Sequence, residues 1–369
     1  MTDLVVISLE PWDQVWRRNQ HLMDGLLRAD ATTRVLFVEP GTDPVHDLRR
    51  GERPRRAAGL RQVAAADYQG RLWCLALTKW LPRKIWPGQD QHWAQVVLRA
   101  ARELAMDAPV LWVNDPRGAQ VLRRGVPWRS VYDITDDWLS ADRAPRERER
   151  LIADEKLLLD HADDVVVCSS ELLQRKGKSR PVHLIPNAID GAAFAASHPR
   201  PADLPPNPCA VYLGTLHRDR LDVDLCVRTA RALGQAGELV LVGPDSLGAQ
   251  DRDRLRSNDI QLLGARPHDS VPAYLQHADV LVVPHLDDDF TASLDPIKRY
   301  EYAASGRPTI ATPVAGFTDG VDGVRVAAPS DFPTMVAALA AEPPPRREPS
   351  TAIPTWVERV AAFQELLPA

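Results

Sequence analysis

The residues with the clearest chemistry are a lysine and a glutamate three positions apart, Lys298 and Glu301, in the stretch SLDPIKRYEYAASGRP (293–308). Asp295 and Pro296 predict a helix start, with the aspartate as N-cap and the proline as first helical residue. A lysine in the first turn opposes the helix dipole, unless an anion binds there. The free N–H groups and Lys298 would together suit a diphosphate, and Glu301 would suit a ribose diol. The alternative is an i,i+3 surface ion pair between the two side chains.

Glycines follow three predicted strands of the second half, at Gly214, Gly243 and Gly264. A glycine at a strand end lets a ligand approach the backbone closely, although each one alone is also an ordinary turn residue. Arg218 and Arg220 follow the first of these glycines. The pattern predicts a ligand lying across the carboxyl edge of a sheet. The aspartates at 287–289 are interpreted as a solvated loop cluster, and no metal is expected.

The first half carries aromatic and charged residues directly after its first strand, in SLEPWDQVWRRNQHL (8–22). Trp12, Asp13, Arg17, Arg18 and His21 crowd this loop and the helix that follows. Contact with a phosphate or carboxylate and a plain surface helix are about equally favoured by this pattern.

A second cluster, Thr135-Asp136-Asp137-Trp138, follows the predicted strand at 130–134. Carboxylates and an indole at a strand end suit hydrogen bonds to sugar hydroxyls and stacking on a sugar ring. A divalent metal is the weaker alternative, because no further ligand stands at the right spacing.

Short apolar runs alternate with helix-length segments, which predicts parallel, doubly wound α/β sheets. The runs favour two sheets that face each other across a cleft, since ligands of such sheets bind at the carboxyl ends of the strands. The predicted strands are Leu4–Ser8, Arg34–Val38, Leu72–Ala76, Val110–Val113, Ser130–Ile134 and Val165–Cys168, then Cys209–Leu213, Leu239–Val242, Ile260–Leu263, Val280–Val283 and Thr309–Ala311.

The expected organisation is an N-terminal acceptor-binding domain at 1–197, a proline-rich linker at 198–208 and a C-terminal domain at 209–342. Nine of ten tryptophans lie at or before position 138, and the tenth, Trp356, lies in a final amphipathic helix. This skew predicts that the segment 350–369 packs back on the N-terminal domain.

Bulk composition excludes several classes of protein. The net charge of -5 gives no overall field for nucleic acid. No signal peptide or membrane span is expected, and the four separated cysteines (Cys74, Cys168, Cys209 and Cys226) are interpreted as buried thiols in a reducing cytoplasm. An arginine-rich loop at 49–61 is interpreted first as a solvated loop. Its alternative is peripheral contact with the inner face of the plasma membrane.

Four further motifs carry a family resemblance: IPNAID (185–190), YLGTLHRDRLD (212–222), GARPHDSVPAYLQHADVLVVP (264–284) and PIKRYEYAASGRPTIAT (296–312). With the opening SLEPWDQVWRRNQHL, they resemble GT-B glycosyltransferases of the large retaining family that includes sucrose and glycogen synthases and bacterial sugar transferases for polysaccharides or natural products. The resemblance implies two Rossmann-like domains and a UDP-, GDP- or dTDP-sugar as co-substrate, with no other cofactor.

The resemblance also implies residue roles. The catalytic residues would be Arg220, Lys298, Asp136 and His21, with the aspartate standing where the family often has histidine. The donor site would comprise Gly214, Thr215, Arg218, Gly243, Arg266, Ser293, Leu294, Asp295 and Glu301. Ser293 stands where the family usually has a glutamate. The acceptor site would comprise Trp12, Asp13, Arg17, Arg18, Asp137 and Trp138.

The implied reaction moves a sugar to a hydroxyl acceptor with retention and without a metal. Charge that develops on the leaving diphosphate would be stabilised by Arg220, Lys298 and the helix start. The alternatives are a GT-B sugar-nucleotide 2-epimerase and a non-catalytic nucleotide- or glycan-binding protein. The sequence does not name the base, the sugar or the acceptor.

Overall fold

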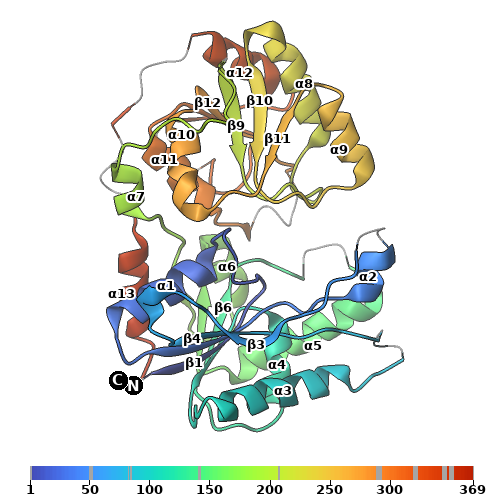
Figure 1. Cartoon of the computed structure of the whole chain (residues 1–369), viewed down its shortest axis with the longest axis vertical. Coiled ribbons are helices and arrows are strands. Elements are labelled where there is room, and N and C mark those ends of the chain that lie inside the picture. Colours follow the sequence, from blue (N-terminus) through green and yellow to red (C-terminus); the bar gives the residue numbers. More distant parts are fainter. Residues whose placement is uncertain are drawn as a thin grey trace. The chain divides into compact units, whose positions relative to one another are not determined.

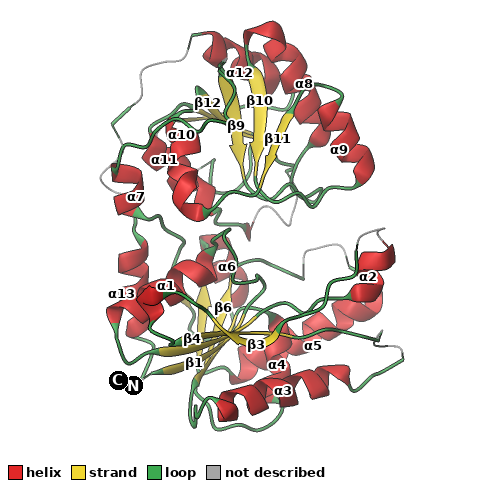
Figure 2. Ribbon diagram, in the orientation of Figure 1, coloured by secondary structure: helices red, strands yellow, loops and turns green. Residues whose placement is uncertain are grey.

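The chain folds into two compact α/β units in a computed structural model (Figure 1). The model describes residues 2–49, 53–81, 83, 85–139, 143–206, 208–287, 293–318, 323–342, 347–348 and 353–368. Unit 1 comprises Met1–Pro186 and Val357–Ala369, and unit 2 comprises Asn187–Trp356. Each unit has a central sheet with helices on both sides, as Figure 2 shows by colour.

The sheet of unit 1 has the strand order β3-β4-β2-β1-β5-β6-β7-β8. Its neighbours pair in parallel, apart from the antiparallel pair of β3 and β4. The strands are β1 (Asp3–Ile7), β2 (Arg34–Val38), β3 (Gly59–Gln62), β4 (Leu72–Ala76), β5 (Val110–Val113), β6 (Ser130–Ile134), β7 (Asp164–Val167) and β8 (His183–Leu184). Continuous apolar runs form the central strands because both faces of the sheet are covered.

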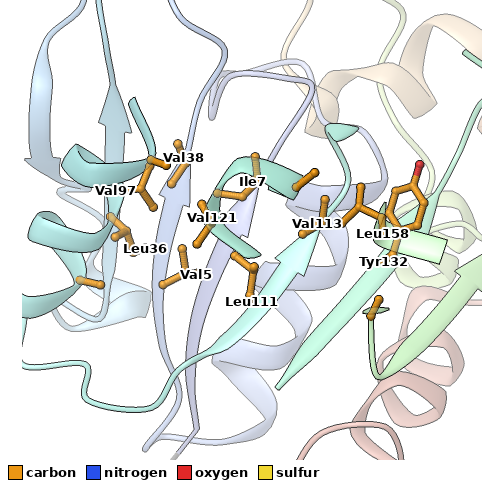
Figure 3. Close-up of a cluster of buried hydrophobic side chains, with 14 of the residues drawn as sticks. Val5, Ile7, Leu36, Val38, Val97, Leu111, Val113, Val121, Tyr132 and Leu158 are labelled. Carbon is orange, nitrogen blue, oxygen red and sulfur yellow. The ribbon is translucent and has the colours of Figure 1, made fainter. Parts of the chain in front are cut away.

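The helices of unit 1 are α1 (Arg18–Ala29), α2 (Pro44–Arg49), α3 (Gln89–Glu103), α4 (Ala119–Leu122), α5 (Pro145–His161) and α6 (Ser170–Lys176), with short 3-10 helices at Ala66–Tyr68 and Pro116–Gly118. Figure 3 shows one core cluster of this unit. In it, side chains of β1, β2, β5 and β6 meet side chains of α3, α4 and α5. This packing holds the carboxyl ends of the strands in place.

The last helix, α13 (Trp356–Gln364), packs within unit 1. Its Phe363 is fully buried, with its ring centroid 4.4 Å from that of Trp112. The guanidinium of Arg18 lies 5.3 Å from the centre of the Phe363 ring. Gly25 of α1 lies against Val360, because a Cβ there would come within 2.4 Å of the Val360 Cγ2.

The sheet of unit 2 is parallel and has the order β11-β10-β9-β12-β13-β14. Its strands are β9 (Cys209–Leu213), β10 (Glu238–Val242), β11 (Gln261–Gly264), β12 (Val280–Val283), β13 (Thr309–Ala311) and β14 (Val324–Val326). Its helices are α7 (Gly191–Ala195), α8 (Val223–Leu233), α9 (Ala249–Arg256), α10 (Val271–Gln276), α11 (Ile297–Ser305) and α12 (Phe332–Ala341), with 3-10 helices at Gly234–Ala236 and His268–Ser270.

The division between the units differs from the linker expected at 198–208, because the described part of that segment belongs to unit 2. Phe194 and Leu204 are buried in the core of unit 2. The Asn187 backbone N–H donates to the Asp295 carboxylate over 2.6 Å. These contacts tie residues 187–206 to unit 2, so the chain passes between the units at Pro186.

Among the described helices, none has both the length and the apolar character that crossing a membrane requires.

Candidate functional site

The strand order of unit 2 reverses between β9 and β12, which lie side by side in the middle of the sheet. Open parallel sheets bind ligands outside the carboxyl ends of the strands at such a reversal. Gly214 follows β9, and Pro284 and His285 follow β12. The residues of this edge are therefore the first candidates for a binding site.

Two glycines at this edge are required by the backbone. Gly214 has φ +143° and Gly243 has φ +145°, a region that side chains with a Cβ avoid. A Cβ on Gly214 would lie 2.8 Å from the Lys298 Nζ and 3.1 Å from the Tyr212 Oη. A Cβ on Gly243 would lie 2.1 Å from the Gly214 carbonyl oxygen. The sequence predicted that a ligand comes close to the backbone at these two strand ends. In the structure, Lys298, Tyr212 and the Gly214 carbonyl lie at these close positions.

Lys298 reaches this edge from the first turn of α11. Its Nζ donates to the Tyr212 hydroxyl over 3.0 Å, lies 3.2 Å from the His285 Nε2 and lies 4.2 Å from the centre of the Tyr212 ring. Burial, followed by the nearby Arg220 cation, lowers the pKa of Lys298 to about 7. The site therefore holds a cation in surroundings that disfavour its charge.

His285 is a residue of this edge that the sequence analysis did not predict. It is buried, and its Nε2 lies 3.1 Å from the Tyr212 Oη. Burial, and then Lys298 and Arg220, lower the pKa of His285 well below 6.5, so the imidazole stays neutral at pH 7. The sequence signal for His285 was its position directly after VLVVP, two residues before the three aspartates at 287–289.

Glu301 lies one turn further along α11 and is partly buried. Burial raises the pKa of Glu301 to about 7, against the opposing effect of Lys298. The ion pairs within 4.0 Å among the described residues do not include one between Lys298 and Glu301, so the surface-pair alternative gains no support.

The start of α11 differs from the prediction by one residue. Pro296 occupies the N-cap position and Ile297 begins the helix. Asp295 does not cap it, because its carboxylate accepts hydrogen bonds from the Asn187 N–H over 2.6 Å and from the Tyr300 hydroxyl over 2.8 Å. The helix start has no side-chain cap, and the N–H groups of Ile297 and Lys298 remain available to an anion, whereas the Arg299 N–H donates to the Pro296 carbonyl over 2.9 Å.

Two arginines follow Gly214, and the structure separates them. Arg218 is exposed and forms an ion pair with Asp251. Arg220 lies close enough to lower the pKa of both Lys298 and His285. Electrostatic proximity therefore favours Arg220 as the second cation of the site.

The remaining predicted donor residues differ in their contacts. Arg266 is held by Asp203 and by the Tyr274 hydroxyl, so its guanidinium is engaged within unit 2. The Thr215 carbonyl accepts from the Tyr212 hydroxyl at 3.5 Å. Ser293 is fully buried, and Leu294 beside it is partly buried. The backbone at 291–292 lies outside the described residues.

Unit 1 has its own reversal of strand order between β1 and β5. Glu10 follows β1, and its Oε2 accepts hydrogen bonds from Asn19 Nδ2 over 3.0 Å and from Ser8 Oγ over 3.3 Å. Asn19 Nδ2 also donates to Asn114 Oδ1 over 2.8 Å. The Asn19 Oδ1 is buried and has no hydrogen-bond partner. This polar cluster was not among the predicted sites.

Glu10 has an unusual carboxyl group. Burial raises the pKa of Glu10 to about 7; Arg17 opposes this rise and Asp136 adds to it. The structure thus brings two predicted residues, Arg17 and Asp136, into the electrostatic surroundings of a carboxyl that can hold or release a proton near neutral pH. The sequence signal was the position of Glu10 directly after the first strand.

Two of the predicted acceptor residues, Arg18 and Asp137, form ion pairs inside unit 1. The Arg18 guanidinium pairs with the fully buried Asp133 over 3.0 Å and donates to the Ile185 carbonyl over 2.8 Å. Asp137 accepts from Lys176 over 2.9 Å and from Arg175 over 2.7 Å. Each of these charged residues near a strand end is thus neutralised inside the unit, and its contact with an acceptor stays a prediction.

The other predicted residues of unit 1 make local contacts. Trp12 packs edge-on against Phe37 with centroids 5.1 Å apart, and its backbone N–H donates to Glu39. His21 packs against Trp16 at 5.2 Å. Asp13 accepts from the Val15 N–H, Asp136 accepts from the Thr135 hydroxyl, and Arg143 stacks over Trp138 at 5.4 Å.

Within the described ranges, no group of three or more His, Cys, Asp or Glu side chains is arranged to hold a metal ion.

Comparison with known proteins gives matches for both the sequence and the fold. Residues 207–342 match the family model for glycosyl transferases group 1. A putative teichuronic acid biosynthesis glycosyltransferase, TuaH, of Bacillus subtilis is 23% identical over 219 residues, and the match covers 55% of each chain. The match therefore spans about half the length of this curated relative.

Two solved structures cover nearly the whole chain. One is a trehalose-6-phosphate protein from E. coli bound with UDP-2-fluoro glucose, with 14% identity, a TM-score of 0.60 and coverage of 99% of this chain and 95% of the other. The second is HepE of Anabaena in complex with UDP and glucose, with 13% identity, a TM-score of 0.60 and coverage of 99% of both chains. The predicted GT-B fold is confirmed, and the predicted resemblance to glycosyltransferases is supported.

Proposed function

We propose that this GT-B chain, whose residues 207–342 match glycosyl transferases group 1, moves a sugar from a nucleotide-sugar donor to a hydroxyl acceptor. The observation that carries the proposal is the convergence of Lys298, Arg220 and the uncapped start of α11 at the strand reversal of unit 2. Two cations and a helix N-terminus at one point favour a doubly charged anion such as a diphosphate.

In this proposal the donor diphosphate binds Lys298 and the first-turn N–H groups of α11, and Arg220 approaches from the loop after β9. Glu301 accepts hydrogen bonds from the ribose diol. The base lies against the backbone of residues 264–266, because the Arg266 guanidinium is engaged by Asp203 and Tyr274. Neutral His285 fixes Lys298 and Tyr212 without adding a third positive charge.

The reaction breaks the bond between the sugar anomeric carbon and the diphosphate oxygen. Negative charge grows on that oxygen, and Lys298, Arg220 and the helix start stabilise it more strongly in the transition state than in the bound donor. We propose retention, with the acceptor hydroxyl attacking from the face that the leaving diphosphate occupied and passing its proton to that group.

For the acceptor we propose the polar cluster of unit 1. The Glu10 carboxyl is fixed by Ser8 and Asn19, and Arg17 and Asp136 contribute to its electrostatic surroundings. A carboxylate there accepts a hydrogen bond from a hydroxyl group, and the neighbouring Asp136 carboxylate can accept a second. This combination suits a sugar or other polyhydroxylated acceptor.

The decisive experiment is a thermal-shift comparison of UDP, GDP, ADP and dTDP on the full chain, since a bound ligand raises the melting temperature by mass action. We expect one nucleoside diphosphate to give the largest shift, and Lys298→Ala and Glu301→Ala each to reduce it. Arg218→Ala is the matched control, because that arginine is exposed and paired with Asp251. Normal nucleotide binding by both site variants would refute the donor site.

Turnover is tested by incubating the preferred nucleotide-sugar with a panel of sugar acceptors, and the anomeric configuration of the product is read by NMR. The same donor incubated alone distinguishes a 2-epimerase, which would give an epimer without an acceptor. We also propose that the protein is cytoplasmic and that it needs no metal ion. Contact of the loop 49–61 with a membrane is a further proposal.

A further inference from the structure

Unit 1 carries a surface cluster of exposed apolar side chains next to cations, which we call the apolar–basic patch: Arg53, Arg56, Lys79, Trp80, Leu81, Arg83, Ile85 and Trp86. The exposed fractions are 55% for Trp80, 43% for Leu81, 67% for Ile85 and 39% for Trp86. Of the ten large apolar side chains that are exposed in the described part of the chain, these four lie within seven consecutive positions. Clustering on this scale marks an interaction surface, whereas single exposed apolar residues do not.

Hydrogen bonds through Thr42, Ala57 and Thr78 connect the two chain segments that carry the patch. The Lys79 N–H donates to the Thr42 carbonyl over 2.8 Å, and the Thr42 N–H donates to the Leu77 carbonyl over 3.0 Å. The Ala57 N–H donates to the Thr78 hydroxyl over 2.9 Å. Ala57, next to Arg56, is therefore held beside Thr78 and Lys79, which directly precede Trp80.

The contact between these segments pairs a cation with an aromatic ring. The Arg56 guanidinium lies 5.2 Å from the centre of the Trp80 ring. Trp86 packs against His92 with ring centroids 5.2 Å apart, and this contact still leaves the indole exposed. Both indoles are thus oriented by neighbours and remain accessible at the surface.

The charge of this region has the opposite sign to that of the chain. Residues 43–90 contain ten Lys and Arg against five Asp and Glu, a net charge of +5, whereas the whole chain carries -5. Some of the cations are paired, with Lys79 bound to Asp43, Arg55 to Asp47 and Arg83 to Asp90. The sequence of this stretch is therefore net positive, and Arg56, which is in none of these ion pairs, places positive charge beside Trp80.

We infer that the apolar–basic patch docks unit 1 on an anionic lipid bilayer, with Trp80, Ile85 and Trp86 entering the interface and the arginines facing acidic headgroups. Tryptophan favours the boundary between headgroups and acyl chains, and lysine and arginine next to it are attracted by acidic lipids. A protein partner would also cover apolar residues, but the excess of cations in a chain of negative net charge fits an anionic surface. The inference does not depend on the proposed transferase activity, because its test needs lipid alone.

The test is co-sedimentation of the full chain with vesicles of phosphatidylcholine, with and without about 30% phosphatidylglycerol, at about 0.05 M and 0.5 M NaCl. We expect binding to the anionic vesicles at low salt, weaker binding at high salt and little binding to phosphatidylcholine. The double variant Trp80→Ser/Trp86→Ser should bind the anionic vesicles at least about tenfold more weakly. Arg53→Gln/Arg56→Gln should lose most of the salt-dependent part.

The matched control is Val357→Ser, which alters another exposed apolar side chain and should leave vesicle binding unchanged. Lipids brominated in the acyl chain should quench the wild-type fluorescence and quench that of Trp80→Ser/Trp86→Ser less. Unchanged melting temperatures establish that the variants are folded. The inference is overturned if the wild type ignores anionic vesicles, if Trp80→Ser/Trp86→Ser binds them equally well, or if that variant only dissociates a self-associated form.

Discussion

Replacing Lys298 by methionine should stabilise the ligand-free protein while weakening nucleotide binding. A pKa lowered from 10.5 to about 7 penalises the charged lysine in the folded state by at most about 4 kcal/mol at pH 7. Methionine has a similar length and no charge, but it loses the hydrogen bond to the Tyr212 hydroxyl and the contact with His285 Nε2, at about 1 kcal/mol each. The net gain is at most about 2 kcal/mol, or roughly 4–8 °C for a unit of this size.

The stability of the wild type relative to Lys298→Met changes with pH in a direction that the pKa of Lys298 fixes. The pKa of Lys298 is lower in the folded than in the unfolded chain, so the unfolded chain binds more protons between pH 7 and 10.5. The stability of the wild type should therefore rise with pH across this window, relative to Lys298→Met. We expect the advantage of the variant to be largest below pH 7 and to disappear by about pH 9, where the residual penalty falls to about the value of the two lost contacts.

The pKa of Lys298 can be measured directly, because Lys298 is the sole lysine between residues 187 and 356. Competitive labelling with acetic anhydride, read by peptide mass spectrometry, gives its pKa. The exposed Lys156 and Lys178 in the same samples serve as internal references for the labelling. A nucleoside diphosphate should protect Lys298 and raise its pKa, because the bound anion favours the charged form. The affinity of the wild type should consequently fall as pH rises above about 7.

Nucleotide affinity should drop at least about tenfold in Lys298→Met, which corresponds to about 1.4 kcal/mol. Lys178→Met, in unit 1, should alter neither stability nor affinity. The reasoning is refuted if Lys298→Met melts at a lower temperature than wild type at pH 7 while binding nucleotide equally well, because the lysine would then be a structural hydrogen-bond donor.

Three further changes test other parts of the structure. Gly214→Ala should cost about 1–3 kcal/mol and weaken nucleotide binding, because its φ is +143° and a Cβ would lie 2.8 Å from the lysine ammonium nitrogen; Gly248→Ala, with nothing within 4 Å of its Cβ, should be neutral by thermal melting. Phe363→Ala should cost about 3–5 kcal/mol with nucleotide affinity unchanged, whereas Val357→Ala at the exposed start of the same helix should change stability by less than about 0.5 kcal/mol. Glu10→Gln should lower the transfer rate at least about tenfold and leave nucleotide affinity within about twofold. The wild-type rate should rise with pH as the Glu10 carboxyl, with a pKa of about 7, ionises, and the variant should lack this rise. A variant that keeps the rise would contradict the proposed role of Glu10.

The central strands could be predicted because their signal is local. Runs such as VLVV at β12 and ELVLV at β10 are apolar on both faces and end at glycine or proline. The strands that were missed lie at sheet edges: β3, β8 and β14 are short, are partly or fully exposed, and each contain at least one polar residue. Such segments become strands through pairing with a neighbour, for example β3 with β4, and their own composition does not require it.

The candidate site was predictable where the local backbone conformation or the helix dipole restricts which residue type can stand at a position. Gly214 and Gly243 occupy conformations that exclude a Cβ, and the lysine conflicts with its helix dipole, so each leaves a trace in the sequence. Ion pairs and hydrogen bonds between residues far apart in the chain give no comparable signal in the sequence. Arg18 and Asp133 are 115 positions apart, and only the folded sheet shows that this arginine neutralises a buried carboxylate.

The missed histidine shows why charge could not be read from residue type alone. His285 and Lys298 are both nominal cations, yet burial lowers the pKa of both groups, Arg220 adds to the effect on both, and Lys298 lowers the pKa of His285 further. A site built only to be stable would separate these three groups or supply a carboxylate beside the ammonium nitrogen. Here the nearest polar partners of the Lys298 Nζ among the described residues are a neutral hydroxyl and a neutral imidazole, which orient the ammonium group without cancelling its charge. An arriving diphosphate therefore meets a cation whose electrostatic penalty it relieves, so part of the stability lost in the free protein returns as binding energy for the anion.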